Sequence, residues 1–364
     1  MNSQKSRIKL FLMMLALAFS LAGADALAAN ITSAQAGNWS ETATWTGGVV
    51  PGIGDNVTIN HDVTINGNFG CNNLTISVGQ TLDFIPGQLN FSIYGALVVT
   101  GTFDASGQKT INFYGSTSAT GTITTDQSTS FAFGSTGNVN MPTTSGGELN
   151  DLTINRDTYT ITMGQSLELF GDLTLTAGTL NYAALSLTVN GNLTRTTGVF
   201  DGTTNGIIKL TGIGTTSPGL SDDYGEFWVL NIDRNESLGG DLELFDDLQV
   251  RAGATLTVGA NTLTLNGPAF TLEAGGTVSS ASTSTLIIGD DNSPAEIALP
   301  AEFTSWDGDF TLNRANGANL DANLAIGGNV NLQQGNLGFD TFDFSISGNL
   351  TRVAGKFDGD TGEL

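Results

Sequence analysis

The segment GDLTLTAG at residues 171–178 returns 20 residues later as GNLTRTTG at residues 191–198. The same 20-residue step joins GNVNLQQG at residues 328–335 to GNLTRVAG at residues 348–355. In each copy, aliphatic residues alternate with polar ones, which is typical of a short strand with one buried face. Glycine and asparagine bound these runs, where turns require them. The sequence therefore predicts short strands separated by tight turns.

A second period is close to 80 residues. LTINR at residues 152–156 returns as LNIDR at 230–234 and as FTLNR at 310–314. A 20-residue unit cannot bury its apolar face alone, whereas stacked units form a continuous core. We therefore predict an all-β fold, a right-handed parallel β-helix (β-solenoid) of roughly 14 coils. A row of β-sandwiches is the alternative, but sandwich strands are longer and hairpins demand no 20-residue repeat.

Composition excludes several classes of function. The 364-residue chain carries 12 Lys+Arg against 35 Asp+Glu, a net charge of −23, so a nucleic-acid phosphate backbone would be repelled. The single cysteine, Cys71, and the single histidine, His61, exclude a disulfide framework, a zinc finger and a multi-histidine metal site. Neither a P-loop, a dinucleotide-binding glycine pattern nor a G-x-S-x-G motif occurs. We expect no cofactor and favour a non-enzymatic role.

Residues 1–28 have the pattern of a secretory signal peptide. Lys5, Arg7 and Lys9 precede an apolar run from Leu10 to Ala22, and the tripeptide ALA at 26–28 fits a cleavage site. An N-terminal membrane anchor is the alternative, but the apolar run is short for a membrane span. We therefore expect a secreted or cell-surface protein of a bacterium, with no membrane span in the mature chain.

Residues 29–66 differ from the repeats that follow at 67–364. NWSETATWTGG at residues 38–48 leads through Pro51, Gly54 and Asp55 to the strand-like VTI at 57–59. This pattern resembles the opening of G8-like modules and of repetitive exported bacterial β-helix surface proteins. The resemblance implies a cap and first coil on a parallel β-helix. Some animal proteins with such a module bind or depolymerise hyaluronan, but no catalytic signature is present here to carry over.

Two interpretations of the tryptophans in this module remain open. A solenoid end exposes unpaired strand edges, which invite association, so Trp39 and Trp45 are favoured as a cap over the first coil. Alternatively, the two rings form a sugar-stacking platform. At the other end, GKFDGDTGEL (355–364) stops where the comparison with NGIIKL (205–210) predicts another strand. We therefore expect that the chain is a fragment of a longer protein.

Paired carboxylates are the candidates for chemistry. They occur in three predicted turns, as Asp222-Asp223, Asp246-Asp247 and Asp290-Asp291. Calcium requires six to eight oxygen ligands, and sugar cleavage requires two carboxylates at a defined separation. Neither an EF-hand loop nor the nonapeptide calcium repeat is present. We favour solvated turn charges, keep calcium as an option, and assign no catalytic, cofactor-binding or metal-binding residue.

Other polar residues are interpreted structurally. We expect His61 to be a turn residue. The three equivalent arginines of the long repeat, Arg156, Arg234 and Arg314, are expected to be exposed, several coils apart, and paired with nearby aspartates. Turn and ladder positions, where stacked side chains hydrogen-bond between coils, are predicted for Asn68, Asn190, Asn192, Asn266 and Asn349.

The sequence is repetitive and contains no recognisable set of catalytic residues. This favours an exported structural or adhesin-like solenoid that contacts an extracellular polymer, glycan or cell-surface component. The alternative is a carbohydrate-binding or carbohydrate-cleaving β-helix that acts on extracellular glycans, which parallel β-helices permit. That alternative would use tryptophan or aspartate side chains.

Overall fold

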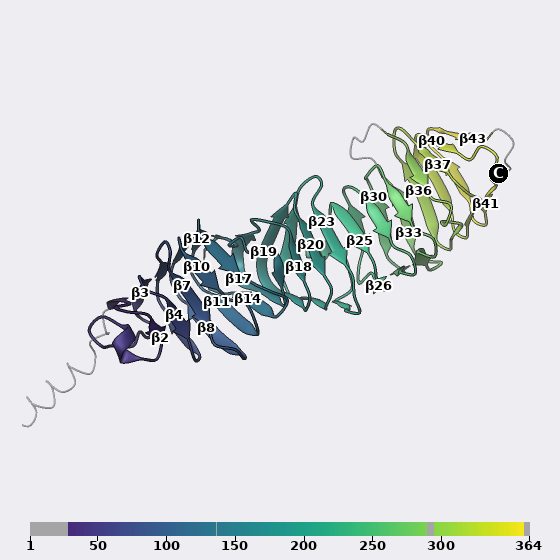
Figure 1. Cartoon of the computed structure of the whole chain (residues 1–364). Coiled ribbons are helices and arrows are strands. Elements are labelled where there is room, and N and C mark those ends of the chain that lie inside the picture. The colour runs from purple at the N-terminus through teal and green to yellow at the C-terminus, as the bar shows by residue number, and fades with distance from the viewer. Residues whose placement is uncertain (1–27, 136, 290–294, 360–364) are drawn as a thin grey trace, which may run out of the picture.

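The computed structural model describes residues 28–135, 137–289 and 295–359. These residues form a parallel β-solenoid of about 15 turns, so the predicted fold class is confirmed (Figure 1). The coils stack from the purple N-terminal end to the yellow C-terminal end of one elongated rod. The predicted signal peptide lies outside the described residues except for Ala28, as does the pair Asp290-Asp291.

The strands stack because each aliphatic side chain finds its equivalent one coil later. Leu187 pairs in register with Ile208, Ile208 with Leu230, and Leu230 with Leu248. All four side chains are fully buried. The intervening residues of these strands point outward, which is the alternation that the 20-residue repeat predicts. Burial of one face therefore continues from coil to coil without interruption.

Three sheets form the N-terminal part of the rod. The first contains β1 (Asn30–Thr32), β3 (Asn56–Ile59), β6 (Leu74–Ile76), β9 (Leu97–Val99) and β12 (Thr117–Ala119). The second contains β2 (Gly37–Asn38), β4 (Val63–Ile65), β7 (Thr81–Phe84), β10 (Thr102–Asp104) and β13 (Thr122–Thr124). The third contains β5 (Phe69–Cys71), β8 (Leu89–Ile93), β11 (Lys109–Phe113), β14 (Thr129–Phe133), β15 (Val139–Asn140), β17 (Leu152–Thr162), β19 (Leu173–Ala183), β21 (Leu193–Arg195), β22 (Val199–Gly202) and β24 (Thr216–Ser217).

Two sheets lie in the middle of the chain. One contains β16 (Glu148–Leu149), β18 (Leu167–Leu169), β20 (Ser186–Val189), β23 (Ile207–Leu210), β25 (Val229–Ile232), β28 (Leu248–Val250) and β31 (Phe270–Leu272). The other contains β26 (Glu236–Ser237), β29 (Thr255–Gly259) and β32 (Thr277–Ser280).

Three sheets complete the C-terminal part. The first contains β27 (Leu242–Leu244), β30 (Thr262–Leu265), β33 (Thr285–Ile288), β36 (Asp309–Asn313), β39 (Val330–Gln334) and β42 (Leu350–Arg352). The second contains β34 (Ile297–Leu299), β37 (Ala318–Leu320), β40 (Asn336–Gly338) and β43 (Lys356–Asp358), and the third β35 (Ser305–Trp306), β38 (Leu324–Ile326) and β41 (Phe344–Ile346). Two single-turn 3-10 helices, η1 (Thr42–Thr44) and η2 (Asp222–Tyr224), are the helices among the described residues.

Glycine is required where turns of successive coils touch. The amide of Gly191 donates to the carbonyl oxygen of Gly171 at 2.9 Å. A Cβ atom at Gly191 would lie 2.3 Å from that same oxygen, closer than real Cβ contacts allow. The glycine that opens each repeat copy is therefore needed for close stacking of the backbone.

Candidate functional site

The three equivalent arginines of the long repeat are buried, contrary to the expectation that they are exposed. Arg156 lies in β17 at an irregular step in strand pairing, Arg234 two residues after β25, and Arg314 directly after β36. Their exposed fractions are 0%, 6% and 0%. The expectation was wrong because the repeat places each arginine at an inward position of its coil, where its charge is removed from water.

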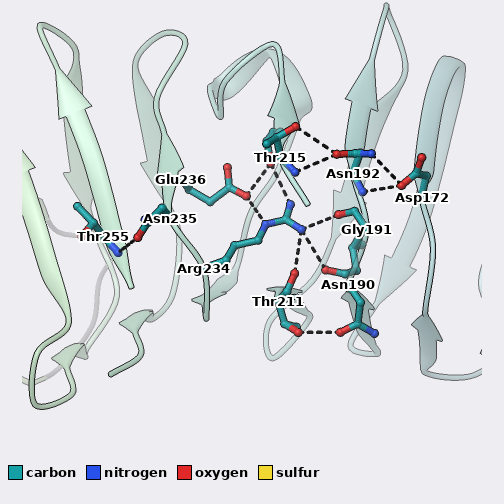
Figure 2. Close-up of polar contacts among 12 residues, drawn as sticks. Asp172, Asn190, Gly191, Asn192, Thr211, Thr215, Arg234, Asn235, Glu236 and Thr255 are labelled. Atoms are coloured by element: carbon teal, nitrogen blue, oxygen red, sulfur yellow. Dashed lines mark hydrogen bonds and ion pairs between the residues drawn. The ribbon is translucent and has the colours of Figure 1, made fainter. Parts of the chain in front are cut away.

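Each arginine reaches backbone carbonyls of earlier coils. Arg234 Nη1 donates to the carbonyl oxygen of Gly191 at 2.6 Å, two coils back, and to that of Thr211 at 2.9 Å, one coil back, as Figure 2 shows. Its Nε atom lies 2.6 Å from Oε1 of the buried Glu236, so its ionic partner is a glutamate rather than the expected aspartate. One side chain therefore ties three consecutive coils together.

The other two arginines repeat this arrangement. Arg314 Nη1 donates to the carbonyl oxygens of Asn266 at 2.9 Å and Gly289 at 3.0 Å. Arg156 donates to those of Gly115 at 3.0 Å and Gly137 at 2.5 Å. The planar guanidinium has five N–H donors, so it can serve carbonyls on several coils at once. We call these three residues the arginine clamps.

The aspartate pairs within the described residues bind backbone amides of neighbouring coils. Oδ1 of Asp222 accepts a hydrogen bond from the amide of Glu243 at 2.6 Å, and Oδ1 of Asp247 accepts one from that of Ala269 at 3.0 Å. Partial burial raises the pKa of both carboxyl groups, with nearby carboxylates adding to the effect. Among the described residues, no group of three or more His, Cys, Asp and Glu side chains could hold a metal ion.

The predicted asparagine positions contact the next or previous coil. Nδ2 of Asn192 donates to Asp172 at 3.1 Å, and Oδ1 of Asn192 accepts from the Thr215 amide at 3.1 Å (Figure 2). Equivalent contacts between coils are made by Asn68, Asn190, Asn266 and Asn349. These contacts agree with a ladder role for these side chains.

Trp39 and Trp45 are inside the cap and do not form an exposed sugar platform. Their exposed fractions are 0% and 2%, and their rings meet edge to face with centroids 4.9 Å apart. The indole N–H of Trp45 donates to the carbonyl oxygen of Trp39 at 2.7 Å, and that of Trp39 to the carbonyl oxygen of Pro51 at 3.4 Å. Trp39 also packs against Phe69 and Phe91 of the following coils, and both indole N–H groups are hydrogen-bonded, so the buried pair is compatible with the expected cap.

His61 is a turn residue, as expected, and Cys71 lies in the core. His61 lies in the turn between β3 and β4, with Nδ1 2.9 Å from the carbonyl oxygen of Ser33. Cys71 is a fully buried free thiol whose pKa is raised by desolvation.

A polar groove lies on the outer face of the third sheet. By strand register, Asn90 of β8 lies beside Thr110 of β11 and Thr110 beside Ser130 of β14. Glutamines stand just before these positions. The hollow along this row has a volume of about 610 Å³. We call it the amide groove and define it by Gln88, Asn90, Gln108, Thr110, Gln127 and Ser130.

An aromatic shelf adjoins the amide groove. The rings of Tyr94 and Tyr114 stack with centroids 4.9 Å apart and an interplanar angle of 7°. Tyr94 is 45% exposed and lines a second hollow of about 300 Å³ with Phe69 and Ile53. The two hollows share Asn68 and Asn90, so they form one continuous surface.

The sequence analysis missed this surface, although a signal was present. GQLNFSIYG at residues 87–95 returns as GQKTINFYG at 107–115, and DQSTSFAFG at 126–134 continues the pattern. The repeated glutamine and the paired tyrosines are its outward-facing residues. Strand alternation predicts which face they occupy, but not that the turns beside them leave a hollow.

Among the described residues, no helix is both long and apolar enough to cross a membrane. Comparisons of the chain with protein-family models, with curated proteins and with solved structures give no match.

Proposed function

We propose that this chain is an exported, non-enzymatic β-solenoid that serves as a stiff structural or adhesin-like rod at the surface of a bacterium. One observation carries the proposal. The buried apolar side chains from Ile31 to Phe344 form a single cluster that runs through the stacked coils. Breaking the rod between any two coils would expose part of this core to water. A rod of this kind suits a spacer that holds a binding surface away from a cell.

The arginine clamps support this role. Each clamp links its own coil to the two preceding coils, and the three recur at the long period of the repeat. Because buried hydrogen bonds to a charged group are stronger than neutral ones, the clamps resist separation of coils under tension. This is the property that a surface spacer needs.

Export is tested by the fate of residues 1–28. When the full chain is produced in a bacterial host, we expect the exported form to begin at Ala29, as read by mass spectrometry of its N-terminus. A variant with Ala26→Asp and Ala28→Asp should remain uncleaved, because charged residues are not accepted at a small-residue cleavage site. Uncleaved wild-type chain confined to the cytoplasm would refute the proposed export.

Stiffness is tested by pulling single molecules of the mature chain from its two ends. We expect resistance until coils unravel, and an earlier loss of resistance in an Arg234→Ala variant. If the wild type extends at the low force of an unstructured chain, the rod role is wrong.

A further inference from the structure

We propose that the amide groove and its aromatic shelf bind a neutral oligosaccharide that lies along the axis of the rod. The inference rests on the proposed function for its setting, because the glycan would be the partner that the adhesin-like rod holds. It differs from the tryptophan platform of the sequence analysis, since both of those rings are buried.

The first argument is the chemistry of the unused polar groups. Gln88, Asn90, Gln108 and Gln127 are exposed, and within the described part of the chain their side-chain amides have no hydrogen-bond partner. Elsewhere on the rod, asparagine side chains bond to a neighbouring coil, as Asn349 does to Asn329 of the preceding coil. A primary amide both donates and accepts hydrogen bonds, and so does a sugar hydroxyl. The groove therefore presents complementary groups for a polyhydroxylated ligand.

The second argument is charge. Lys109 is the one basic residue among the described residues that line the groove. It is 2% exposed, and its ammonium group donates to the carbonyl oxygens of Ile85 at 2.7 Å and Gly87 at 2.5 Å. The carboxylate of Asp151 accepts from Asn150 at 2.8 Å and Ser130 at 3.1 Å. Among the described residues that line the groove, none therefore offers a free cation to hold a uronate or a sulfate, and the net charge of −23 repels both. The ligand that fits is uncharged.

The third argument is the aromatic shelf. Tyr114 covers one face of Tyr94, and the second hollow is lined by residues of earlier coils, such as Gly70. That hollow therefore lies on the side of Tyr94 away from Tyr114. An aromatic face beside hydrogen-bonding groups suits a sugar ring, which has an apolar C–H face and a polar rim.

The fourth argument is dimension. The groove runs from Asn68, just before β5, across β8, β11 and β14 to Asp151, just before β17. At the usual strand spacing, the four steps between these five coils span about 19 Å. One coil is about as tall as one hexose unit is long, so successive sugars would meet equivalent amides. The backbone groups here are already paired within the sheet, so a peptide cannot add as a further strand. These features favour a glycan over a peptide.

The test uses the purified mature chain and isothermal titration calorimetry. The probes are maltohexaose, cellohexaose, mannohexaose and chitohexaose, with hexagalacturonate as the acidic comparison. We expect saturable binding of at least one neutral hexasaccharide and weaker binding of hexagalacturonate. A Gln88→Ala/Gln108→Ala variant should bind about tenfold more weakly, since it loses amide hydrogen bonds to the ligand. Tyr94→Ala should also weaken binding, through loss of the shelf.

The matched control is Gln333→Ala, which removes a partly exposed amide from β39, outside the groove. It should leave the Kd unchanged, and circular dichroism should show the same fold for every variant. No binding of any neutral probe, binding unaffected by the double substitution, or displacement of the bound sugar by casein peptides would overturn the proposal. The calorimetry uses isolated protein, so a negative result would disprove sugar binding without bearing on the tests of export and stiffness. Negative results in those two tests would likewise leave the sugar-binding result standing.

Discussion

The guanidinium of Arg234 donates to the carbonyl oxygen of Gly191 at 2.6 Å, across 43 residues of sequence and two coils of the rod. The equivalent contact of Arg314 with Asn266 spans 48 residues, and that of Arg156 with Gly115 spans 41. A position that recurs in sequence at the long period therefore repeats one three-coil contact along the solenoid.

The first prediction concerns the stability of this contact. Arg234→Ala should lower the free energy of unfolding by about 3–5 kcal/mol, because it leaves the buried carboxylate of Glu236 and several carbonyls without a partner. Arg234→Lys should also destabilise, since an ammonium lacks the planar fork of donors. Chemical denaturation followed by circular dichroism measures both effects.

The control for this prediction is Arg251→Ala. Arg251 is 38% exposed and pairs with Asp233 and Glu273 at the surface, so its loss should cost less than about 1 kcal/mol. Equal destabilisation by the two alanine variants would contradict a special role of the buried clamp.

The second prediction concerns the N-terminal cap. Trp39→Ala should lower the free energy of unfolding by about 3–5 kcal/mol, because it opens a cavity between Trp45 and Phe91. Val49→Ala, at a site that is 58% exposed, should change it little. Thermal denaturation of the mature chain distinguishes a buried cap from a surface role, for which the two substitutions would have similar effects.

The third prediction concerns pH. Burial raises the pKa of Asp222 and Asp247 above the usual aspartate value, so the folded chain binds protons more tightly than the unfolded chain. Their contribution to stability therefore increases as pH falls from 7 towards the ordinary value of about 3.9. The melting temperature should be recorded across this range for the wild type and for an Asp222→Asn/Asp247→Asn variant. As the pH falls, the melting temperature of the wild type should change in a more favourable direction than that of the variant, by falling less or rising more.

Asparagine retains an oxygen that can accept the amide hydrogen bonds of Glu243 and Ala269, so this variant should still fold. Asp321→Asn, at an exposed site, serves as the control and should keep the wild-type pH profile. If the double variant shows the same profile as wild type, these two carboxyl groups do not titrate as argued.

The fourth prediction concerns the single thiol. Cys71 is fully buried and its pKa is raised, so the reactive thiolate is suppressed in the folded chain. A thiol reagent such as 5,5′-dithiobis(2-nitrobenzoate) should label it only after denaturation. Rapid labelling of the native chain would show that the coil around Cys71 opens readily.

Sequence reasoning succeeded where the signal is local or periodic. The 20-residue return of GDLTLTAG as GNLTRTTG, with aliphatics at alternate positions, predicts parallel coils, and Leu173 does pair with Leu193 in register. The burial of Trp39 and Trp45 also agrees with the favoured cap. These features follow from the alternation of apolar and polar residues and from the 20-residue repeat, both of which can be read directly from the sequence.

Reasoning about individual polar residues was less successful. Arg156, Arg234 and Arg314 were expected at the surface because charged side chains are seldom buried. Their burial depends on carbonyl groups that two earlier coils present to one point, and no sequence pattern of the arginine itself reveals that convergence. The amide groove was not predicted for a similar reason, because its glutamines come from separate coils that only the folded chain brings side by side.

The sequence by itself determined the coil length, the alternation of inward and outward residues, and the stacking of equivalent residues in successive coils. The reason is that apolar faces that recur every 20 residues are buried only by the neighbouring copies of the repeat. Tertiary structure alone decided which carbonyls surround each arginine and where the outer face is hollowed. Those features depend on the turn paths and stacking of several coils, which place groups about 20 to 48 residues apart within hydrogen-bond distance of one another.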